Sequence, residues 1–262
     1  MDNQVSEWTQ SMLDKLKASL GFGAAKVDTV LDNIALNQGE ELAGTIYIKG
    51  GDVEQTIDAI KLTFNTEVKE ESDSGVSYQT FPLGEMAITD TFVIHPGEEK
   101  PIPFTWQLHE ETPITALNTR NNQSRFWVET QLDIEFAIDP SDRDYIEVHP
   151  LPVALPVVAG IIHTIEQAGF ELEKADIEKG FLQGNDFSSH SGCYQEIEFL
   201  KSGFIGSKEI ELSFVLDQHQ IHCLAEVDKS LSLRDDQYFS FTLPLDASDI
   251  NIRTAVEPIL SV

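Results

Sequence analysis

The sequence predicts an all-β protein made of two tandem β-sandwich domains with a few short flanking helices. Apolar residues recur at every second position along many short runs, and polar residues fill the positions between them. Because strand side chains point alternately to opposite faces, each run has one buried and one solvated side, as in antiparallel sheets. Glycine, proline and asparagine turn signals separate the runs, and many short, regularly punctuated strands are typical of a sandwich.

A helix is expected over residues 1–24, ahead of the first strand. Ser6 is a suitable N-cap, and Gly21 or Gly23 is a suitable stop. The apolar stripe at helical spacing consists of Trp8, Met12, Leu13, Leu16 and Leu20. We interpret this segment as a packing helix that covers one end of a sheet. Docking on a partner or on a membrane surface is the alternative, although the polar face of the helix is not strongly basic.

Residues 25–138 form the predicted N-terminal sandwich, because the period of the apolar residues changes to two near Val27. The clearest alternating runs lie within 42–48, 60–68, 102–108 and 126–138. The turn signals between the runs are Asn37-Gln38-Gly39, Gly50-Gly51-Asp52, Asp73-Ser74-Gly75 and Pro96-Gly97. Each run is therefore predicted to form one strand of a sheet whose outer face is exposed to solvent.

A hinge or linker is predicted over 139–152, where Asp139 and Pro140 break the last strand and further prolines follow. Residues 153–262 form the predicted C-terminal sandwich. A short buried helix is expected at its start, ending near Gly169, and a terminal helix from about Asp246. Pro258 falls inside that terminal helix, which weakens its pattern. Alternating runs lie between the two helices, around 197–199, 210–216, 221–227 and 239–243.

The charge of the chain excludes several classes of partner. It has 45 Asp and Glu against 17 Lys and Arg, which gives a formal net charge of −28. Binding to phosphate backbones depends on Lys and Arg, and so acidic a surface repels nucleic acids and anionic membranes. We interpret the charge as that of a soluble, self-repelling surface, in preference to an acidic binding face for a basic partner. No stretch is long and apolar enough to cross a bilayer, so we expect no integral membrane association.

Few residues of the sequence suggest a catalytic or metal-binding site. The sequence contains no nucleophile elbow, and Cys193 has acidic neighbours, Glu196 and Glu198, that oppose formation of a thiolate. A buried structural cysteine is the favoured interpretation. The sharper candidate is the cluster of His219, His222 and Cys223, whose side chains suit zinc or copper. His219 and Cys223 share a strand face while His222 points the other way, so a regular strand cannot bring all three together.

Three stretches of the chain resemble the SpoOM-type sporulation-control proteins, which belong to the wider arrestin-like group. The first stretch runs from Gly23 through Lys49-Gly50-Gly51 to Ile60, the second from Phe126 to Tyr145, and the third from Val148 to Phe170. The resemblance implies two arrestin-like β-sandwich domains joined by a hinge. It also implies a cytoplasmic, non-enzymatic regulator tied to control of bacterial sporulation, without a catalytic motif.

The expected function is therefore that of a regulatory adaptor that acts through protein–protein interaction. We predict no catalytic residues, cofactor or metal, and a reducing cytoplasm suits a chain with only two cysteines. The partner proteins, the binding surface and a homo-oligomeric state are left open. The alternative is a metal-binding or cysteine-dependent enzyme that uses His219, His222 and Cys223.

Overall fold

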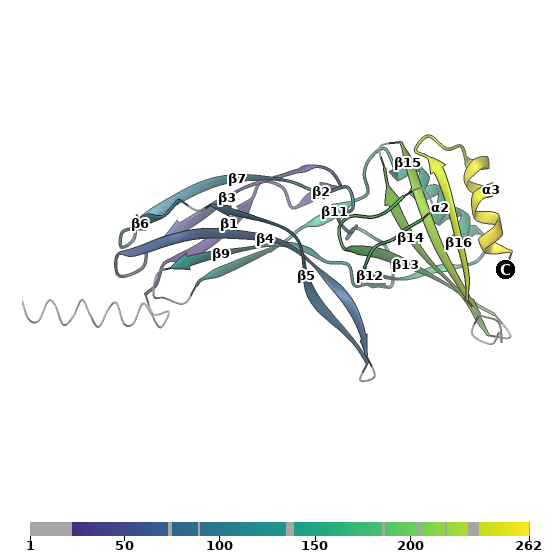
Figure 1. The fold of residues 1–262 in the computed structure, drawn as a ribbon, viewed down its shortest axis with the longest axis horizontal. Coiled ribbons are helices and arrows are strands. Elements are labelled where there is room, and N and C mark those ends of the chain that lie inside the picture. Colours follow the sequence, from purple (N-terminus) through teal and green to yellow (C-terminus); the bar gives the residue numbers. More distant parts are fainter. Residues whose placement is uncertain are drawn as a thin grey trace, which may run out of the picture.

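The computed structural model describes residues 23–72, 75–88, 90–134, 139–184, 187–203, 206–217, 219–229 and 236–261. The helix predicted over 1–24 therefore lies outside the described residues, except for its last two positions. Phe136 and Ile138 of the longest predicted strand also lie outside them. The described chain is mostly β, as predicted, and Figure 1 shows two lobes connected end to end. Within this part of the chain no helix is long and apolar enough to cross a membrane.

The N-terminal lobe has two main sheets around one core. A three-stranded sheet has the order β1-β3-β7, and it faces a second sheet in which β9 and β4 pair antiparallel. Ile46, Leu62 and Val128, from β3, β4 and β9, are fully buried between them. The strands of this half of the chain are β1 Lys26–Leu31, β2 Ala35–Asn37, β3 Glu41–Lys49, β4 Gln55–Ser72, β5 Gly75–Ile88, β6 Phe92–Ile94, β7 Glu99–Gln107, β8 Asn121–Asn122, β9 Phe126–Ile134, β10 Ser141–Tyr145 and β11 Glu147–His149. Of these, β8 pairs with Lys174 and Ala175 of the C-terminal lobe.

The residues predicted as a hinge, 139–152, form two strands of this lobe instead. β10 turns back antiparallel along β9, and β11 pairs parallel with β2. The Asp139-Pro140 pair does break the strand, but the break is a hairpin turn: the Leu132 N–H donates to the Pro140 carbonyl at 3.1 Å. Proline and clustered charges occur both in tight turns and in linkers between domains, so the sequence alone does not distinguish a turn from a linker here.

The C-terminal lobe pairs one sheet with two helices. Its strands β12 to β16 follow one another as antiparallel neighbours, and α2 and α3 cover one face. Ile161 of α2, Val256 of α3 and Phe199 of β13 are fully buried in the shared core. The elements are α2 Leu155–Gln167, β12 Glu171–Lys179, β13 Cys193–Ser202, β14 Ser207–Leu216, β15 Gln220–Lys229, β16 Gln237–Pro244 and α3 Asp249–Leu260.

This lobe differs from the predicted second sandwich. Helices lie where a sandwich has its second sheet, because the apolar stripes of α2 and α3 cover the apolar side of the strands. Two lysines fix the helix ends. The Lys201 Nζ donates to the Ala168 carbonyl at 2.6 Å, and the Lys208 Nζ donates to the Ile259 and Leu260 carbonyls at 3.1 and 3.0 Å. They satisfy carbonyl groups that have no partner inside a helix.

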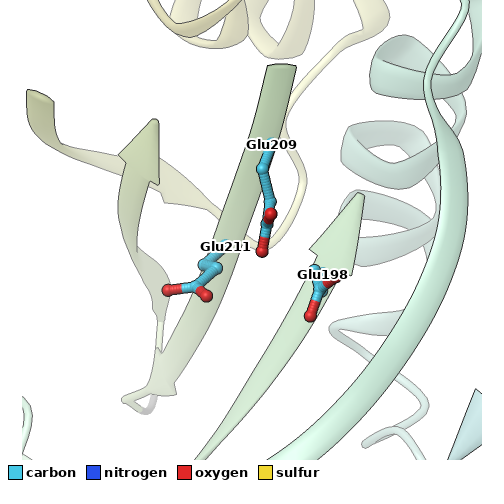
Figure 2. Close-up of side chains that lie close together, drawn as sticks. All are labelled: Glu198, Glu209 and Glu211. Atoms are coloured by element: carbon cyan, nitrogen blue, oxygen red, sulfur yellow. The ribbon is translucent and has the colours of Figure 1, made fainter. Parts of the chain in front are cut away.

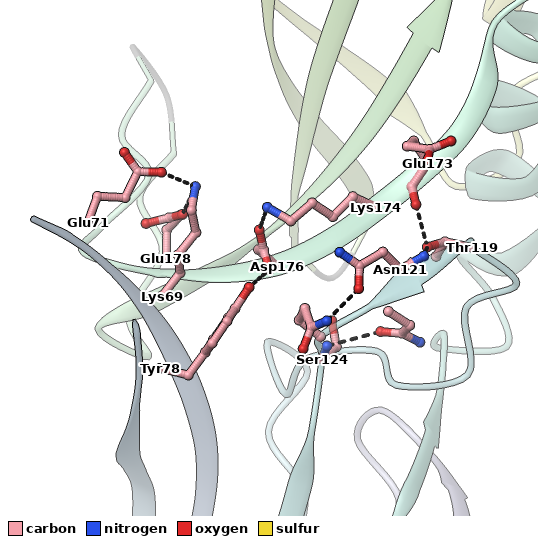
Figure 3. Close-up of polar contacts among 12 residues, drawn as sticks. Lys69, Glu71, Tyr78, Thr119, Asn121, Ser124, Glu173, Lys174, Asp176 and Glu178 are labelled. Carbon is pink, nitrogen blue, oxygen red and sulfur yellow. Dashed lines mark hydrogen bonds and ion pairs between the residues drawn. The ribbon is translucent and has the colours of Figure 1, made fainter. Parts of the chain in front are cut away.

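The two lobes are joined by backbone pairing and by buried polar groups (Figure 3). β12 pairs parallel with β4 at Glu178 and Lys69, whose charged atoms lie 3.2 Å apart. The Tyr78 hydroxyl, on the β4–β5 hairpin, donates to Asp176 Oδ1 at 2.8 Å. Gln195 of β13 bonds both the N–H and the carbonyl of Ile114, at 3.0 and 2.6 Å. Such bonds hold the lobes in one arrangement.

Replacing Gln195 by leucine is expected to lower the free energy of unfolding by about 1–3 kcal/mol, because the partnered backbone groups of Ile114 lose their bonds. Urea unfolding measures the change. Gln131→Leu, at an exposed position of β9, is the matched control and should change stability by less than about 0.5 kcal/mol. Equal stability of the two variants would contradict this account of the junction.

Candidate functional site

The cluster of His219, His222 and Cys223 does not converge. Cys223 is completely buried between the sheet and the helices, and this burial raises the pKa of its thiol far above the ordinary value. His222 points to the opposite face, where its ring stacks on Phe187 at 4.4 Å and its nitrogens lie 2.9 Å from Thr242 Oγ1 and 3.1 Å from Asp217 Oδ2. These three side chains are therefore not placed to bind one metal ion together, and the geometry gives no support to the metal-binding alternative built on them.

Cys193 is not an activated nucleophile either. Its side chain is buried beside Val68 and Ile177, and burial raises the pKa of the thiol to about 11. A thiol with this pKa is almost wholly protonated at neutral pH, whereas catalysis requires the thiolate. The interpretation of both cysteines as buried structural residues is confirmed.

The site that the structure reveals is the outer face of the C-terminal sheet, opposite the helices. Residues at alternate positions of β12 to β15 point to this face, since their neighbours in the chain point into the core. Eight of them are acidic, and we call this surface the acidic face. Its carboxylates are Asp176, Glu178, Glu196, Glu198, Glu209, Glu211, Glu226 and Asp228.

The register of the strands sets like charges directly opposite one another. Glu198 of β13 faces Glu211 of β14, and Glu211 faces Glu226 of β15. Glu209 likewise faces Asp228. Like charges at directly opposed positions of a sheet destabilise it. The acidic face therefore holds electrostatic repulsion that folding has to overcome.

Together with burial, the repulsion raises the pKa values of Glu196 and Glu211, near the centre of the acidic face. Partial burial, followed by the charges of Glu211 and Glu178, raises the pKa of Glu196 to about 8. Partial burial, followed by Glu209 and Glu226, raises the pKa of Glu211 to about 7. Both carboxyl groups therefore retain a proton for a substantial part of the time near neutral pH.

Little positive charge offsets these carboxylates. In the described chain, Lys69 bonds Glu71 and Glu178, and Lys174 bonds Asp176, all along the β12 side of the face. Glu198, Glu211 and Glu226 form a row across the three strands β13, β14 and β15. Among the residues that the structure describes, no Lys or Arg forms an ion pair with this row. The uncompensated charge thus increases from β12 towards β15.

Glu198, Glu209 and Glu211 form the tightest group on the acidic face. Figure 2 shows their carboxylates on two neighbouring strands, and one oxygen from each lies within 4.8 Å of the others. Carboxylate oxygens are the ligands that calcium and magnesium prefer. However, these three come from a flat sheet, without a loop of carbonyl groups to complete a coordination shell. We therefore treat the group as part of a charged surface.

A cavity lies at the junction of the lobes. It encloses about 260 Å³, and Phe64 and Trp106, stacked at 4.2 Å, form part of its apolar wall. Its polar groups already have partners inside the protein: the Glu111 carboxylate accepts the backbone N–H groups of His190 and Ser191 at 2.8 to 3.0 Å. This arrangement braces the junction and leaves few groups to orient a ligand.

The sequence analysis did not predict the acidic face, because it interpreted the glutamates of each strand only as the solvent-exposed side of that strand. A signal was present in the alternation itself. Successive strands carry acidic residues two positions apart, as in Glu196 and Glu198 or Glu209 and Glu211. Adjacent antiparallel strands bring such pairs together, which predicts a single charged surface.

The fold and this surface define a class of protein: a two-lobed, mostly β protein that presents a large acidic surface. Residues 13–231 match the family described as SpoOM protein. The sporulation-control protein spo0M of Bacillus subtilis (strain 168) is 37% identical over 229 residues, which are 84% of this chain and 81% of that protein. The crystal structure of Spo0M from Bacillus subtilis matches with a TM-score of 0.74 at 30% identity, covering 92% of this chain and 99% of the other. The chain belongs to the SpoOM family of sporulation-control proteins.

Proposed function

We propose that this protein is a non-enzymatic, cytoplasmic adaptor of the sporulation-control family, and that its acidic face binds a basic segment of a partner protein. The observation that carries the proposal is the row of Glu198, Glu211 and Glu226, directly opposed across three strands without a neutralising Lys or Arg in the described chain. Lys and Arg side chains of a partner would relieve this repulsion, so charge complementarity favours such a partner.

The two packed sheets of the N-terminal lobe support an arrestin-like character for that half only. In the C-terminal half, a sheet backed by helices offers its other face to partners. Because the junction bonds hold the lobes together, we propose that the N-terminal lobe acts as the scaffold for this face. An adaptor of this kind requires only that its acidic face be complementary to the surface of the partner, and it catalyses no reaction.

Binding of fluorescein-labelled dodecalysine tests the proposal, with dodecaglutamate as the control peptide. We expect the triple variant Glu198→Gln/Glu211→Gln/Glu226→Gln to bind dodecalysine about tenfold more weakly than the unchanged protein at 0.05 M salt. Three lost charge interactions of about 0.5 kcal/mol each amount to this factor. The replacements are isosteric and remove repulsion, so they should leave the fold intact.

A second triple variant controls for net charge. Glu41→Gln/Asp90→Asn/Asp133→Asn removes three exposed carboxylates from the N-terminal lobe. It changes the formal net charge of −28 by the same three units as the first variant, to −28 + 3 = −25. The proposal requires this control to bind dodecalysine nearly as well as the unchanged protein. If both triple variants weaken binding equally, the acidic face has no special role.

A further inference from the structure

Strand β16 is an open edge beside the acidic face. It pairs with β15 and, within the described chain, with no other strand. The register and the bond from the Leu245 N–H to the His219 carbonyl show which residues of β16 bond to β15. The alternate residues, Tyr238, Ser240 and Thr242, therefore direct their backbone N–H and carbonyl groups away from the sheet.

Three other strand edges of the described chain, those of β7, β1 and β5, are covered or interrupted. Pro101 and Pro103 lie on β7 at positions whose N–H groups would face outward, because the bond from Leu108 N–H to the Glu40 carbonyl sets the alternation. On β1, the outward N–H of Thr29 donates to Asp142 Oδ2 at 2.7 Å. The long edge of β5 is interrupted by Pro82 and by a bulge in its pairing with β4.

β16 lacks these protections. From Gln237 to Leu243 it contains neither a charged residue nor a proline, and proline first occurs at Pro244. Exposed edges without charge, proline or cover are templates for another strand. Tyr238 and Ser240 are exposed along this edge.

We propose that β16 accepts an extended, basic segment of a partner protein as an additional antiparallel or parallel strand of the C-terminal sheet. The inference rests on the proposed function, and it specifies the conformation and the side-chain pattern of the partner. Main-chain hydrogen bonds along an edge supply affinity, while alternate side chains supply specificity.

The surroundings of β16 define the side chains that such a segment needs. Tyr238 lies directly opposite Glu226 and donates its hydroxyl to Glu226 Oε1 at 2.9 Å. A Lys or Arg beside Tyr238 would contact its exposed ring. Glu226 lies two strand spacings, about 9.6 Å, from the added strand, so the long basic side chain would extend across the ring towards it. On the other side, Phe239 and Phe241 are only partly buried against the helices. The segment should therefore alternate basic and apolar residues.

A second copy of this chain does not fit the same edge. Each copy carries a formal net charge of −28. Pairing of two β16 strands about a two-fold axis would continue one sheet through both copies and bring their rows of carboxylates towards each other. Charge complementarity selects a basic partner over self-association.

The test uses the full chain and an eight-residue peptide of alternating lysine and valine with blocked ends. A matched peptide carries a methyl group on every backbone nitrogen, so it has the same charge but cannot pair as a strand. We expect the unmodified peptide to bind at least tenfold more tightly than the methylated one. Equal binding of both peptides would overturn strand addition while leaving the acidic face as a binding surface. Failure of both to bind would overturn this inference and the proposed function together.

Ser240→Pro is the matching change in the protein, with Ser240→Ala as its control. Proline removes an N–H that points away from β15, so the existing pairing keeps its hydrogen bonds. We expect Ser240→Pro to weaken binding of the unmodified peptide at least tenfold and Ser240→Ala to leave it unchanged. Unchanged binding by a folded Ser240→Pro variant would contradict the inference.

Hydrogen exchange on the unchanged protein gives a readout that does not depend on how Ser240→Pro folds. The amides of Tyr238, Ser240 and Thr242 should exchange rapidly in the free protein and slow at least tenfold when the peptide is bound. Protection elsewhere, with none at these three amides, would also overturn strand addition.

Discussion

Replacing Gly51 by alanine is expected to lower the free energy of unfolding by about 3 kcal/mol or more. A Cβ atom at this position would lie 1.9 Å from the carbonyl oxygen of Gly23 and 2.6 Å from the carbonyl carbon of Ala24. The same Gly23 oxygen accepts the N–H of Asp52 at 2.8 Å, so it cannot move away without losing that bond. The clash is with backbone, which cannot rotate aside as a side chain can.

Gly97→Ala is the matched control for this prediction. Gly97 donates its N–H to the Gly50 carbonyl at 3.2 Å, but a Cβ atom there would have no neighbour within 4 Å. Its φ of 71° makes alanine cost about 1–2 kcal/mol through the backbone alone. Urea unfolding of both variants separates the steric cost from the conformational cost. A Gly51→Ala variant no less stable than Gly97→Ala would show that the close approach is not maintained.

Replacing Glu196 by glutamine is expected to raise stability at pH 8 by about 1–2 kcal/mol and to change it little at pH 5. The folded protein raises the pKa of Glu196 from 4.5 to about 8, chiefly through burial and then through Glu211. A raised pKa contributes stability that is fully present below the ordinary value and is lost as pH rises through the folded value. The expected gain is far smaller than the full pKa shift implies, because solvent screens a partly exposed group.

The stability of the unchanged protein should accordingly fall between about pH 5 and pH 8, through Glu196 and Glu211 together. Groups with a lowered pKa act in the opposite direction at lower pH: backbone N–H groups lower the pKa of Asp217, and Lys49 lowers that of Glu99. Thermal unfolding from pH 4 to pH 9 measures the profile. A Glu196→Gln variant with the same pH dependence as the unchanged protein would contradict the repulsion on the acidic face.

The strand pattern was predictable from the sequence because burial on one face imposes alternation directly. The runs around Ile46, Leu62 and Val128 became strands of the N-terminal core for this reason. The close approach of Gly51 to Gly23 was not predictable, since it joins segments that no local pattern connects. It gives a physical reason for the glycine pair that helped to identify the family.

In the C-terminal lobe, the sequence pattern predicts the strands but does not predict what covers them. Alternation predicts that one side of a strand is covered, but it does not say whether helices or another sheet provide the cover. The helices were visible in the spacing of Ile161 and Ile165 and in the segment after Asp246, and Pro258 is accommodated in α3. Their position over the sheet required tertiary structure. The same limit applies to the acidic face, whose charges meet only through the strand register.

If a basic partner relieves the repulsion on the acidic face, its binding changes the protonation of the central glutamates. Carbon-13 NMR titration of the glutamate carboxyl groups, with and without saturating dodecalysine, tests this prediction most directly. We expect the pKa of Glu196 and that of Glu211 to fall when dodecalysine binds, because lysine side chains favour the charged carboxylates; burial, the larger cause, keeps both pKa values above the ordinary value. If dodecalysine binds and both pKa values stay as they are in the free protein, the peptide is held elsewhere and the proposed role of the acidic face is contradicted.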